Sequence, residues 1–467
     1  MSLLAVAGAN SAVAGGYDID NSVKLEADNG EKFISSQFGS AGNQKTWTVS
    51  FWVKITELGA YQMYWGCFDT YHYKGTDDKM YVNFRGGSEN FFLGTNRVFR
   101  DTSAWYHFVV VCDATNGTAA DRGRFYVNGV RETDYQLTTY QNMDSNDNSF
   151  WNGANVHSVG GQNGSSTFDV SGYMAEFHSV DGQALDPTSF GEFDSNTGIW
   201  KPIEYTGTYG TNGFYLDFEN SSDLGDDVSG NSKAFTNTNI TSADQATDTP
   251  TNNFCTMNML DRTDGNSKNQ EGATKVTTDG GSGWCSMIAT MGVTKGKWYW
   301  ETQRSGGSSD SNDVVVGIAG SEDPYIPFNT AAKYYIGNVA TSSSMGFYTT
   351  GSPNVRNGSG DSLTNSAGDI IMIGLDVDNS KLYFGVNGTW DTAYGSSGST
   401  IWSSFDDQFI MPAVAVYQGK QIKINFGGYA SYTISSAASD ANGYGNFEYA
   451  PPSGYYALCS KNLAEFG

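Results

Sequence analysis

Residues 105–113 read Trp-Tyr-His-Phe-Val-Val-Val-Cys-Asp, and after a polar turn residues 124–129 read Arg-Phe-Tyr-Val-Asn-Gly. Residues 369–381 read Asp-Ile-Ile-Met-Ile-Gly-Leu-Asp-Val-Asp-Asn-Ser-Lys, and residues 382–388 read Leu-Tyr-Phe-Gly-Val-Asn-Gly. Each pair has an apolar strand ending at an aspartate, a turn, an aromatic-rich strand and an Asn-Gly turn, which is typical of β-hairpins. The repetition predicts two domains built on one β-sandwich plan. Such sandwiches are mostly scaffolds for recognition, and enzymes are the minority use.

The composition is that of an all-β protein, and the length of 467 residues suggests two or three domains. Glycine is abundant at 57 residues, aromatic residues reach 14%, charged residues are only 16%, and long helix-forming runs are absent. The run 105–112 is apolar after its first residues, which predicts a central strand covered on both faces. Apolar and polar residues alternate over 46–56, which predicts a half-buried strand.

The net charge is −24, from 50 acidic and 26 basic residues. Such a charge argues against binding nucleic acid, which needs a basic stripe, and against docking on anionic lipid. We expect no membrane insertion, because no segment approaches the ~18 apolar residues of a membrane span. The acidity has two interpretations: it keeps the protein soluble, or it includes acidic loops that hold Ca²⁺.

The five cysteines are odd in number and contain no Cys-x-x-Cys, which argues against a disulfide framework and against zinc. This usage fits a protein made and assembled in a reducing cytosol. Residues 1–16 superficially resemble a signal peptide, but no Lys or Arg precedes Lys24 and the apolar run is short. We therefore expect a flexible or docking N-terminal arm over 1–16, with a secretion signal as the alternative.

The rest of the chain divides into three parts. Residues 17–218 form the first predicted domain, and residues 253–467 form the second. Residues 219–252 between them are polar and nearly free of aromatic side chains, which predicts a linker. The alternative is an ordered segment packed along a sandwich edge.

The first predicted domain resembles a laminin-G-like (concanavalin A-like) domain. The matching pieces follow in order and cover most of 17–190: 47–54, 105–111, 125–130, 158–161, 171–177 and 184–187. The resemblance implies a jelly-roll β-sandwich. The expected fold class is therefore all-β, with two concanavalin A-like β-sandwich domains in tandem.

The second predicted domain resembles a SPRY domain, itself a bent β-sandwich. The matching pieces are 296–301, 316–319, 369–376, 383–388, 411–416 and 424–427. SPRY domains generally bind protein or peptide surfaces through loops at one end of the sandwich. Loops 321–335 and 340–368 are the long ones here and would form the variable surface.

The two domains in tandem are joined by residues 182–194, 213–218 and 248–254, and an N-terminal arm runs into residues 17–22. This arrangement resembles virion structural proteins of marine bacteriophages. The resemblance covers nearly the whole chain and implies a fibre, spike or capsid-decorating protein. The implied partners are other virion proteins of capsid or tail and a host-surface polysaccharide or protein, with several copies of the chain on each particle. The implied location is the virion, assembled in the host cytoplasm. The alternatives are a purely structural decoration protein with no host ligand and a secreted glycan-degrading enzyme.

One pattern of possible catalytic residues occurs near the N-terminus. Residues 26–31 satisfy Glu-x-Asp-x-x-Glu, which occurs in some glucanases of the concanavalin A-like fold. Those enzymes need two carboxylates on one face of a regular strand, about 5 Å apart for retention. Asn29-Gly30 favours a hairpin turn, which would put Glu26 and Glu31 on opposite arms. We therefore expect no catalytic site and no enzymatic activity, and we expect His107, inside the 105–112 strand, to be structural.

Calcium is the one cofactor that the sequence favours. Laminin-G-like domains often bind one Ca²⁺ with loop carboxylates at a sandwich rim. Two acidic loops offer hard oxygen ligands of this kind, and the candidates are Asp144, Asp147, Asp223 and Asp226. The alternative is that both loops are merely solvated.

Aromatic side chains in loops are the candidates for ligand binding, because sugars stack their apolar faces on rings. The predicted ligand-binding residues are Tyr64, Trp65, Tyr71, Trp151, Tyr325, Tyr334, Tyr335 and Trp402. Tyr61 and Tyr73 belong to the same aromatic run as the first three. The alternative is that residues 61–73 are two strands of the core.

Overall fold

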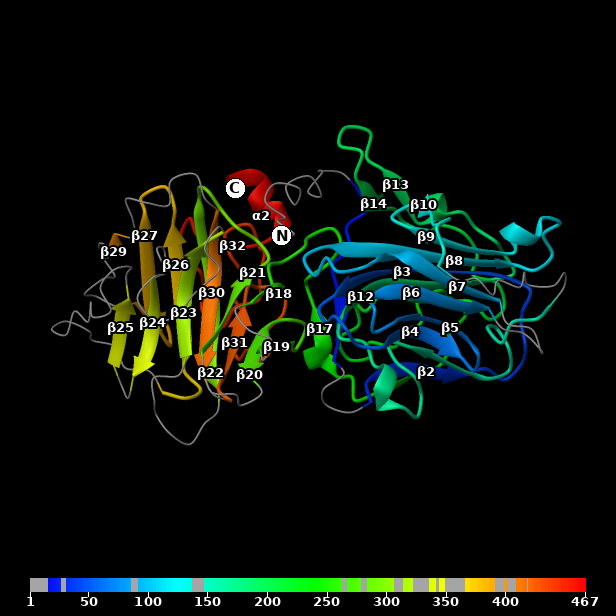
Figure 1. Ribbon diagram of the computed structural model, residues 1–467, viewed down its shortest axis with the longest axis horizontal. Coiled ribbons are helices and arrows are strands. Elements are labelled where there is room, and N and C mark those ends of the chain that lie inside the picture. Colours follow the sequence, from blue (N-terminus) through cyan, green and yellow to red (C-terminus); the bar gives the residue numbers. More distant parts are fainter. Residues whose placement is uncertain are drawn as a thin grey trace. The chain divides into compact units, whose positions relative to one another are not determined.

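The computed structural model describes residues 16–26, 31–84, 91–136, 147–262, 267–278, 284–305, 314–321, 336–341, 344–348, 366–390, 399–400, 409–417 and 419–467 (Figure 1). The described chain divides into two compact units, one ending at Thr251 and the next beginning at Asn252. Nearly all regular structure is β, and most strand pairs are antiparallel.

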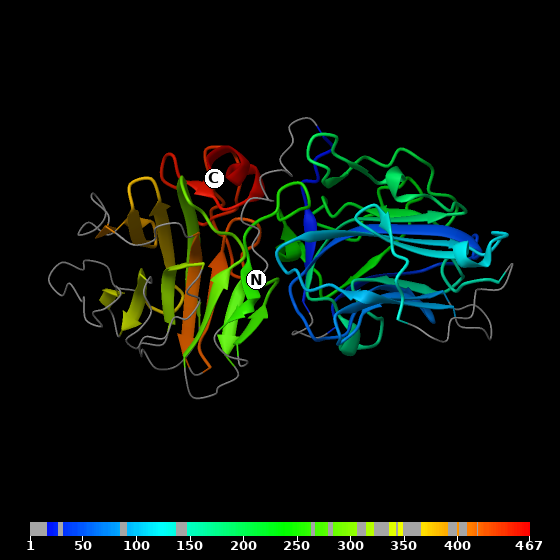
Figure 2. The same cartoon turned by 45° about the horizontal axis from the view of Figure 1, so that its top comes forward.

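The first unit is a sandwich of two sheets, which lie as stacked layers in Figure 2. The larger sheet has the strand order β10 (Val130–Arg131), β9 (Gly123–Val127), β8 (Trp105–Asp113), β3 (Thr46–Ile55), β12 (Gly172–Asp181), β1 (Ser22–Leu25) and β17 (Gln245–Ala246), and β15 (Phe214–Leu216) also pairs with β12. The smaller sheet has the order β16 (Thr236–Thr238), β2 (Phe33–Gln37), β11 (Val156–Val159), β4 (Gln62–Cys67), β5 (Thr70–Lys74), β6 (Lys79–Phe84) and β7 (Phe92–Val98). A separate hairpin of β13 (Gly191–Phe193) and β14 (Trp200–Pro202) projects from this sandwich (Figure 1). The described residues of this unit include the 3₁₀ turns η3 (Ala119–Asp121), η4 (Ser166–Phe168), η5 (Pro187–Ser189) and η6 (Ser242–Asp244).

The larger sheet of the first unit is buried on both faces. Phe108, Val110 and Cys112 of β8 point into the space between the sheets. Val109 and Val111 point the other way and pack under a segment that contributes Leu185, Phe190, Tyr205 and Tyr209. The strand covered on both faces that we predicted at 105–112 is therefore confirmed. The prediction that the strand at 46–56 is half-buried is wrong, because β3 lies beside β8 and nine of its ten residues are buried.

Residues 219–251 do not form a linker, and they belong to the first unit. β16 pairs with β2, and β17 pairs with β1. Asp248 is 1% exposed, accepts from Lys54 Nζ at 2.7 Å and accepts from Trp105 Nε1 at 3.0 Å. Polar composition suggested a linker, but two carboxylates of this segment, Asp244 and Asp248, are buried and paired with lysines inside the fold.

The second unit is also a two-sheet sandwich. One sheet has the order β18 (Met257–Arg262), β21 (Trp284–Ala289), β30 (Ile410–Tyr417), β23 (Val314–Gly320), β24 (Ile336–Thr341) and β25 (Ser344–Tyr348). The other has the order β19 (Ser267–Gln270), β20 (Lys275–Thr278), β31 (Gln421–Asn425), β22 (Lys297–Ser305), β26 (Ile370–Asp376), β27 (Lys381–Val386) and β28 (Thr389–Trp390), with β29 (Ser399–Thr400) on β27 and β32 (Tyr456–Ala457) on β22. The unit ends in one short helix, α2 (Ser460–Phe466).

The two repeated runs of sequence form equivalent hairpins in the two units. β8 pairs with β9, and β26 pairs with β27. Both Asn-Gly pairs adopt positive φ, at 47° and 78° for Asn128 and Gly129 and at 49° and 82° for Asn387 and Gly388. These are the backbone angles that a tight hairpin turn requires. The two-sandwich architecture predicted from the repetition is confirmed.

A buried carboxylate ties the C-terminal part of the second unit to its sheet. Glu301 on β22 is fully buried and accepts hydrogen bonds from the hydroxyls of Tyr299 and Tyr432, at 2.8 and 2.9 Å. The backbone N–H groups of Glu448 and Tyr449 donate to the same carboxylate, at 3.0 and 2.8 Å. Burial raises the pKa of Glu301, and four donors satisfy its oxygens. This group is therefore structural.

Candidate ligand-binding face

The outer face of the smaller sheet in the first unit carries a group of partly exposed aromatic side chains. Along β5, Thr70, His72 and Lys74 are buried, while Tyr71 and Tyr73 are partly exposed. This is the alternation of an ordinary strand, with one set of side chains in the sandwich and the other outside it. We call the outward set the aromatic face, and its members are Tyr61, Tyr71, Tyr73, Tyr81, Phe92 and Phe168.

The rings of the aromatic face form a continuous chain across the sheet. Tyr73 and Tyr81 are directly opposite one another on β5 and β6, and their rings stack at 4.9 Å. The Tyr81 ring stacks on Phe92 of β7 at 5.6 Å. On the other side, Tyr61 lies 6.1 Å from Tyr73 and 5.8 Å from Phe168. Register between neighbouring strands therefore produces a row of rings rather than isolated side chains.

Two central phenols of this face, Tyr73 and Tyr81, are held uncharged at neutral pH. The Tyr81 hydroxyl donates to Asp77 at 2.8 Å and accepts from the Gln136 amide at 2.6 Å. Burial, together with the hydrogen bond to Asp77, raises the pKa of Tyr81 to about 12. Burial also raises the pKa of Tyr73. The stacked pair therefore presents apolar ring surfaces with neutral hydroxyl groups.

A pocket of about 410 Å³ adjoins the aromatic face on the same sheet. It lies across β2, β11 and β4, and its lining residues are Gln37, Met63, Gly66, Cys67, Phe68, Asn155, Val156, Ser158, Gln162 and Asn163. Gly66 lies opposite Tyr71 in the β4–β5 register. A Cβ at Gly66 would lie 3.0 Å from Met63 Sδ and 3.1 Å from Tyr71 Cβ. The absence of a side chain at Gly66 thus lets Met63, which lines the pocket, and Tyr71 of the aromatic face pack closely at this position.

Three of the predicted ligand-binding residues lie in the core of the first unit. Tyr64, Trp65 and Trp151 are 0% exposed, and the Trp65 and Trp151 rings lie 4.7 Å apart. The prediction that they contact a ligand is wrong, and the alternative of two core strands at 61–73 is correct for Tyr64 and Trp65. Tyr71 lies on the aromatic face. Four further candidates lie outside the described residues: Tyr325, Tyr334, Tyr335 and Trp402.

Sequence reasoning missed the pocket and half of the aromatic face. Tyr81 and Phe92 stand on strands that the sequence analysis did not define, and Phe168 comes from η4. The amide side chains of the pocket come from the end of β2 and from the loops on either side of β11. The available signal was the alternation of residues along the strands. Tyr71 and Tyr73 flank the buried His72, and Tyr81 lies between the buried Met80 and Val82.

The candidate metal ligands are engaged in local hydrogen bonds. Asp223 Oδ1 accepts from the backbone N–H of Gly225 at 3.1 Å and from Asn237 Nδ2 at 2.8 Å. Asp226 Oδ2 accepts from Asn220 Nδ2 at 3.0 Å. Asp147 is partly buried, and Asp144 lies outside the described residues. Within the described ranges, no group of three or more His, Cys, Asp or Glu side chains could hold a metal ion, and Ca²⁺ binding stays a prediction.

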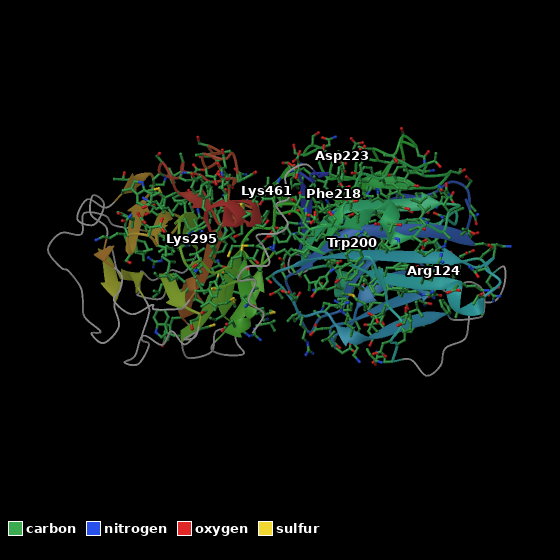
Figure 3. The ribbon with its side chains drawn as sticks, turned by 90° about the horizontal axis from the view of Figure 1, so that it is seen from above. Arg124, Trp200, Phe218, Asp223, Lys295 and Lys461 are labelled. Atoms are coloured by element: carbon green, nitrogen blue, oxygen red, sulfur yellow. The ribbon has the colours of Figure 1, made fainter. Side chains whose placement is uncertain are left out.

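A buried Ser-His pair resembles a catalytic dyad but is arranged for another role. Ser50 Oγ lies 2.8 Å from His107 Nε2, and Trp200 Nε1 donates to His107 Nδ1 at 3.0 Å (Figure 3 labels Trp200). Because Nδ1 accepts this bond, the proton of the neutral ring sits on Nε2 and points at Ser50. Burial lowers the pKa of His107 to about 3, so that the ring stays neutral. A general base would need a free lone pair toward the hydroxyl, and this geometry offers a donor instead.

Two family descriptions match the chain. Residues 28–187 match the concanavalin A-like lectin/glucanases superfamily, and residues 297–429 match the SPRY domain. A search of curated proteins finds no match. Among the described residues, no helix is long and apolar enough to cross a membrane.

Solved structures resemble each unit at low identity. The SPRY domain of human HERC1 is 22% identical over 36% of this chain and 96% of its own, with a TM-score of 0.24. A heptameric SAP-like pentraxin from Limulus polyphemus is 12% identical over 48% of this chain and 98% of its own, with a TM-score of 0.30. A putative carbohydrate-binding protein from Bacteroides ovatus is 16% identical over 48% of this chain and 60% of its own, with a TM-score of 0.35. At these scores we draw no functional argument from the structures.

The all-β fold class expected from the sequence, with two β-sandwich domains in tandem, is confirmed. The chain carries a concanavalin A-like domain of the laminin-G type followed by a SPRY domain.

Proposed function

We propose that this chain is a recognition protein without enzymatic activity, and that its first domain binds glycans on the outer face of its smaller sheet. The observation that carries the proposal is the row of rings on the sheet face that also bears a pocket. Sugar rings have apolar faces that stack on aromatic rings and hydroxyl edges that hydrogen-bond to amides. An apolar surface with a few placed polar groups is the usual composition of such a site.

The other outer face of the first domain supports the assignment by contrast. There the segment bearing Phe190, Tyr205 and Tyr209 packs over β8 and β12, so its aromatic side chains stabilise the fold. On the smaller sheet, Tyr71 and Tyr73 are partly exposed and Tyr61 is 44% exposed. Exposed rings gathered on one face of a stable sandwich indicate an interaction surface.

A direct test compares two tyrosines on opposite sides of the same domain. Binding of the full chain to a panel of neutral and anionic polysaccharides would be measured by isothermal titration calorimetry. Tyr73→Ala should weaken binding about tenfold, whereas Tyr205→Ala should leave it within about twofold. Circular dichroism would establish that both variants are folded. Failure of every polysaccharide in the panel to bind the wild-type chain would overturn the proposal.

The finer part of the proposal is that this recognition serves a phage particle. It rests on the sequence alone, through the tandem order of the two domains and its likeness to marine phage virion proteins. Partners would then be capsid or tail proteins, and many copies on one particle would strengthen weak glycan sites. The chain would be made and assembled in the host cytoplasm and located on the virion.

Immunogold or cryo-electron microscopy localisation on purified particles tests this part. Signal at the tail or at fibre tips would support host recognition. Signal spread over the capsid would favour the alternative of a decoration protein. Absence from particles would overturn the virion proposal and return attention to a secreted glycan-degrading enzyme, for which release of reducing sugar is the assay.

A further inference from the structure

Among the described residues that line the pocket, no side chain is charged at neutral pH. Its polar groups are four amides and one hydroxyl, from Gln37, Asn155, Gln162, Asn163 and Ser158. The Cys67 thiol donates to the backbone carbonyl of Phe150, and burial raises its pKa to about 12. A pocket without a fixed charge has no electrostatic partner for an ionic ligand.

Three of the four amides are free to contact a ligand. The Gln37 amide donates to the Phe38 carbonyl at 2.9 Å, and Ser158 Oγ donates to the Gly66 carbonyl at 3.3 Å. The side-chain amides of Asn155, Gln162 and Asn163 make no hydrogen bond within the part of the chain that the structure describes. Each amide offers both donors and an acceptor, as a sugar hydroxyl does. The free groups therefore match the hydroxyl edge of a sugar.

The walls of the pocket supply the complementary apolar surface. Met63 lies at one side, and Phe68 stands at the tight turn between β4 and β5. The Phe68 side chain is 71% exposed, and its ring lies 5.6 Å from that of Phe150. A large apolar side chain held this far out of the core at a pocket rim is positioned for contact with something outside the chain.

We infer that the pocket takes an uncharged, hydroxyl-rich sugar unit of the glycan that lies on the aromatic face, and that it rejects units carrying a carboxylate or a sulfate. The inference rests on the proposed function. An anion that entered the pocket would lose hydration without gaining a cation or a charged donor. The net charge of −24 adds repulsion at longer range. Neutral units lose no comparable hydration and regain their hydrogen bonds on the free amides.

The first experiment compares each polysaccharide that binds the chain with a carboxymethylated form of the same polymer. The polymer backbone is then constant, and the change is a charged carboxymethyl group on some of its hydroxyls. Binding of the carboxymethylated form should be weaker by about tenfold or more at low ionic strength, which corresponds to at least about 1.4 kcal/mol. Part of this difference should disappear at high salt, because screening removes the long-range repulsion but not the desolvation cost.

The second experiment introduces a positive charge into the lining of the pocket. Asn163 is exposed and its side chain is free, so Asn163→Lys should fold normally. This variant should bind the carboxymethylated form more tightly. The ratio of the affinity for the neutral polymer to that for the carboxymethylated form should therefore fall several-fold. Thr206→Lys is the matched control, because it adds the same charge at an exposed position between Tyr205 and Tyr209, on the opposite side of the domain.

The outcomes separate the inference from the proposed function. Equal affinity for a neutral polymer and its carboxymethylated form, with binding that still depends on Tyr73, would overturn the inference and keep glycan binding. The same conclusion would follow if only anionic polymers bound, or if Asn163→Lys behaved like Thr206→Lys. Failure of all polymers to bind would overturn both. A preference for the neutral form that Asn163→Lys narrows and Thr206→Lys does not would support the inference.

Discussion

Two aromatic clusters on opposite sides of one sheet have similar composition and different roles. The inner cluster comprises Trp47, Tyr64, Trp65, His72 and Trp151, all 0% exposed. The aromatic face comprises rings that are stacked but partly exposed, and the two clusters share strand β5. The order Tyr71-His72-Tyr73 on β5 places two rings outside and one inside. Position in the strand, and not residue type, therefore decides whether an aromatic side chain packs in the core or lies on the outer face of the sheet.

The largest expected difference between the clusters is in stability. Trp65→Ala should lower the free energy of unfolding by about 3–5 kcal/mol, because it leaves a large cavity against Trp47 and Trp151. Tyr73→Ala should cost no more than about 1 kcal/mol, because its ring is partly exposed. Urea denaturation followed by far-UV circular dichroism measures both. Equal costs for the two substitutions would contradict the division into core and surface.

The next effect is on binding. Replacing both Tyr71 and Tyr73 with alanine should weaken binding of a neutral polysaccharide by about thirtyfold, or about 2 kcal/mol, as two stacking surfaces are lost. Replacing both with phenylalanine keeps the rings and should cost less than about fivefold. Calorimetry with the same polymer measures both double variants. If the phenylalanine variant lost as much as the alanine variant, the hydroxyl groups and not the ring faces would carry the binding.

The sequence predicted the hairpins and the two sandwiches because their signals are local. An Asn-Gly pair requires positive φ at two adjacent residues, and both pairs have it. The polar segment 219–251 was misleading, since composition does not show that Asp248 pairs with Lys54 inside the fold. Likewise, the alternation over 46–56 does not show that a segment far along the chain covers the polar face of that strand.

The candidate site was harder to predict, because alternation divides residues into two faces without saying which one is buried. In β4, successive residues do not alternate regularly between the two faces of the sheet. The register with β5 shifts between Met63 and Trp65, so that the successive residues Tyr64 and Trp65 are both buried. A bulge of this kind leaves no local signature among the aromatic residues. The pocket amides could not be predicted for a different reason: the pairing of β11 with β2, which is distant in the sequence, brings Gln37 close to Asn155 and Gln162.

A third, smaller effect concerns acid stability and the histidine of the inner cluster. Burial lowers the pKa of His72 to about 3, and both ring nitrogens lack a hydrogen-bond partner among the described residues. Burial likewise lowers the pKa of His107 to about 3 and that of His157 to about 4. The unfolded chain has an ordinary histidine pKa near 6.5, so below that pH it binds more protons than the folded chain does. Stability should therefore fall as pH drops from about 6.5 toward 3.

His72→Phe removes one of these three contributions. The ring would remain among Phe51, Phe108 and Phe125, and stability near pH 7.5 should change by less than about 1 kcal/mol. The slope of stability against pH between 6.5 and 4 should become shallower. Urea denaturation at several pH values gives both quantities. A slope equal to that of the wild-type chain would show that His72 is not held neutral by the core.

The smallest expected effect separates the ring of Phe68 from its backbone. Phe68 has a φ of 51°, which is unfavourable for a residue with a Cβ and is readily adopted by glycine. Phe68→Gly should raise the free energy of unfolding by up to about 1 kcal/mol, because the side chain is 71% exposed and loses little packing. Phe68→Ala keeps the unfavourable φ and should leave stability nearly unchanged.

Both variants lose the ring at the pocket rim, so both should weaken binding of a neutral polysaccharide by about threefold. Equal binding losses with unequal stabilities would establish that the ring contacts the ligand and that the strained turn only holds it in place. Unchanged binding in both variants would remove Phe68 from the site and leave the aromatic face as the sole stacking surface.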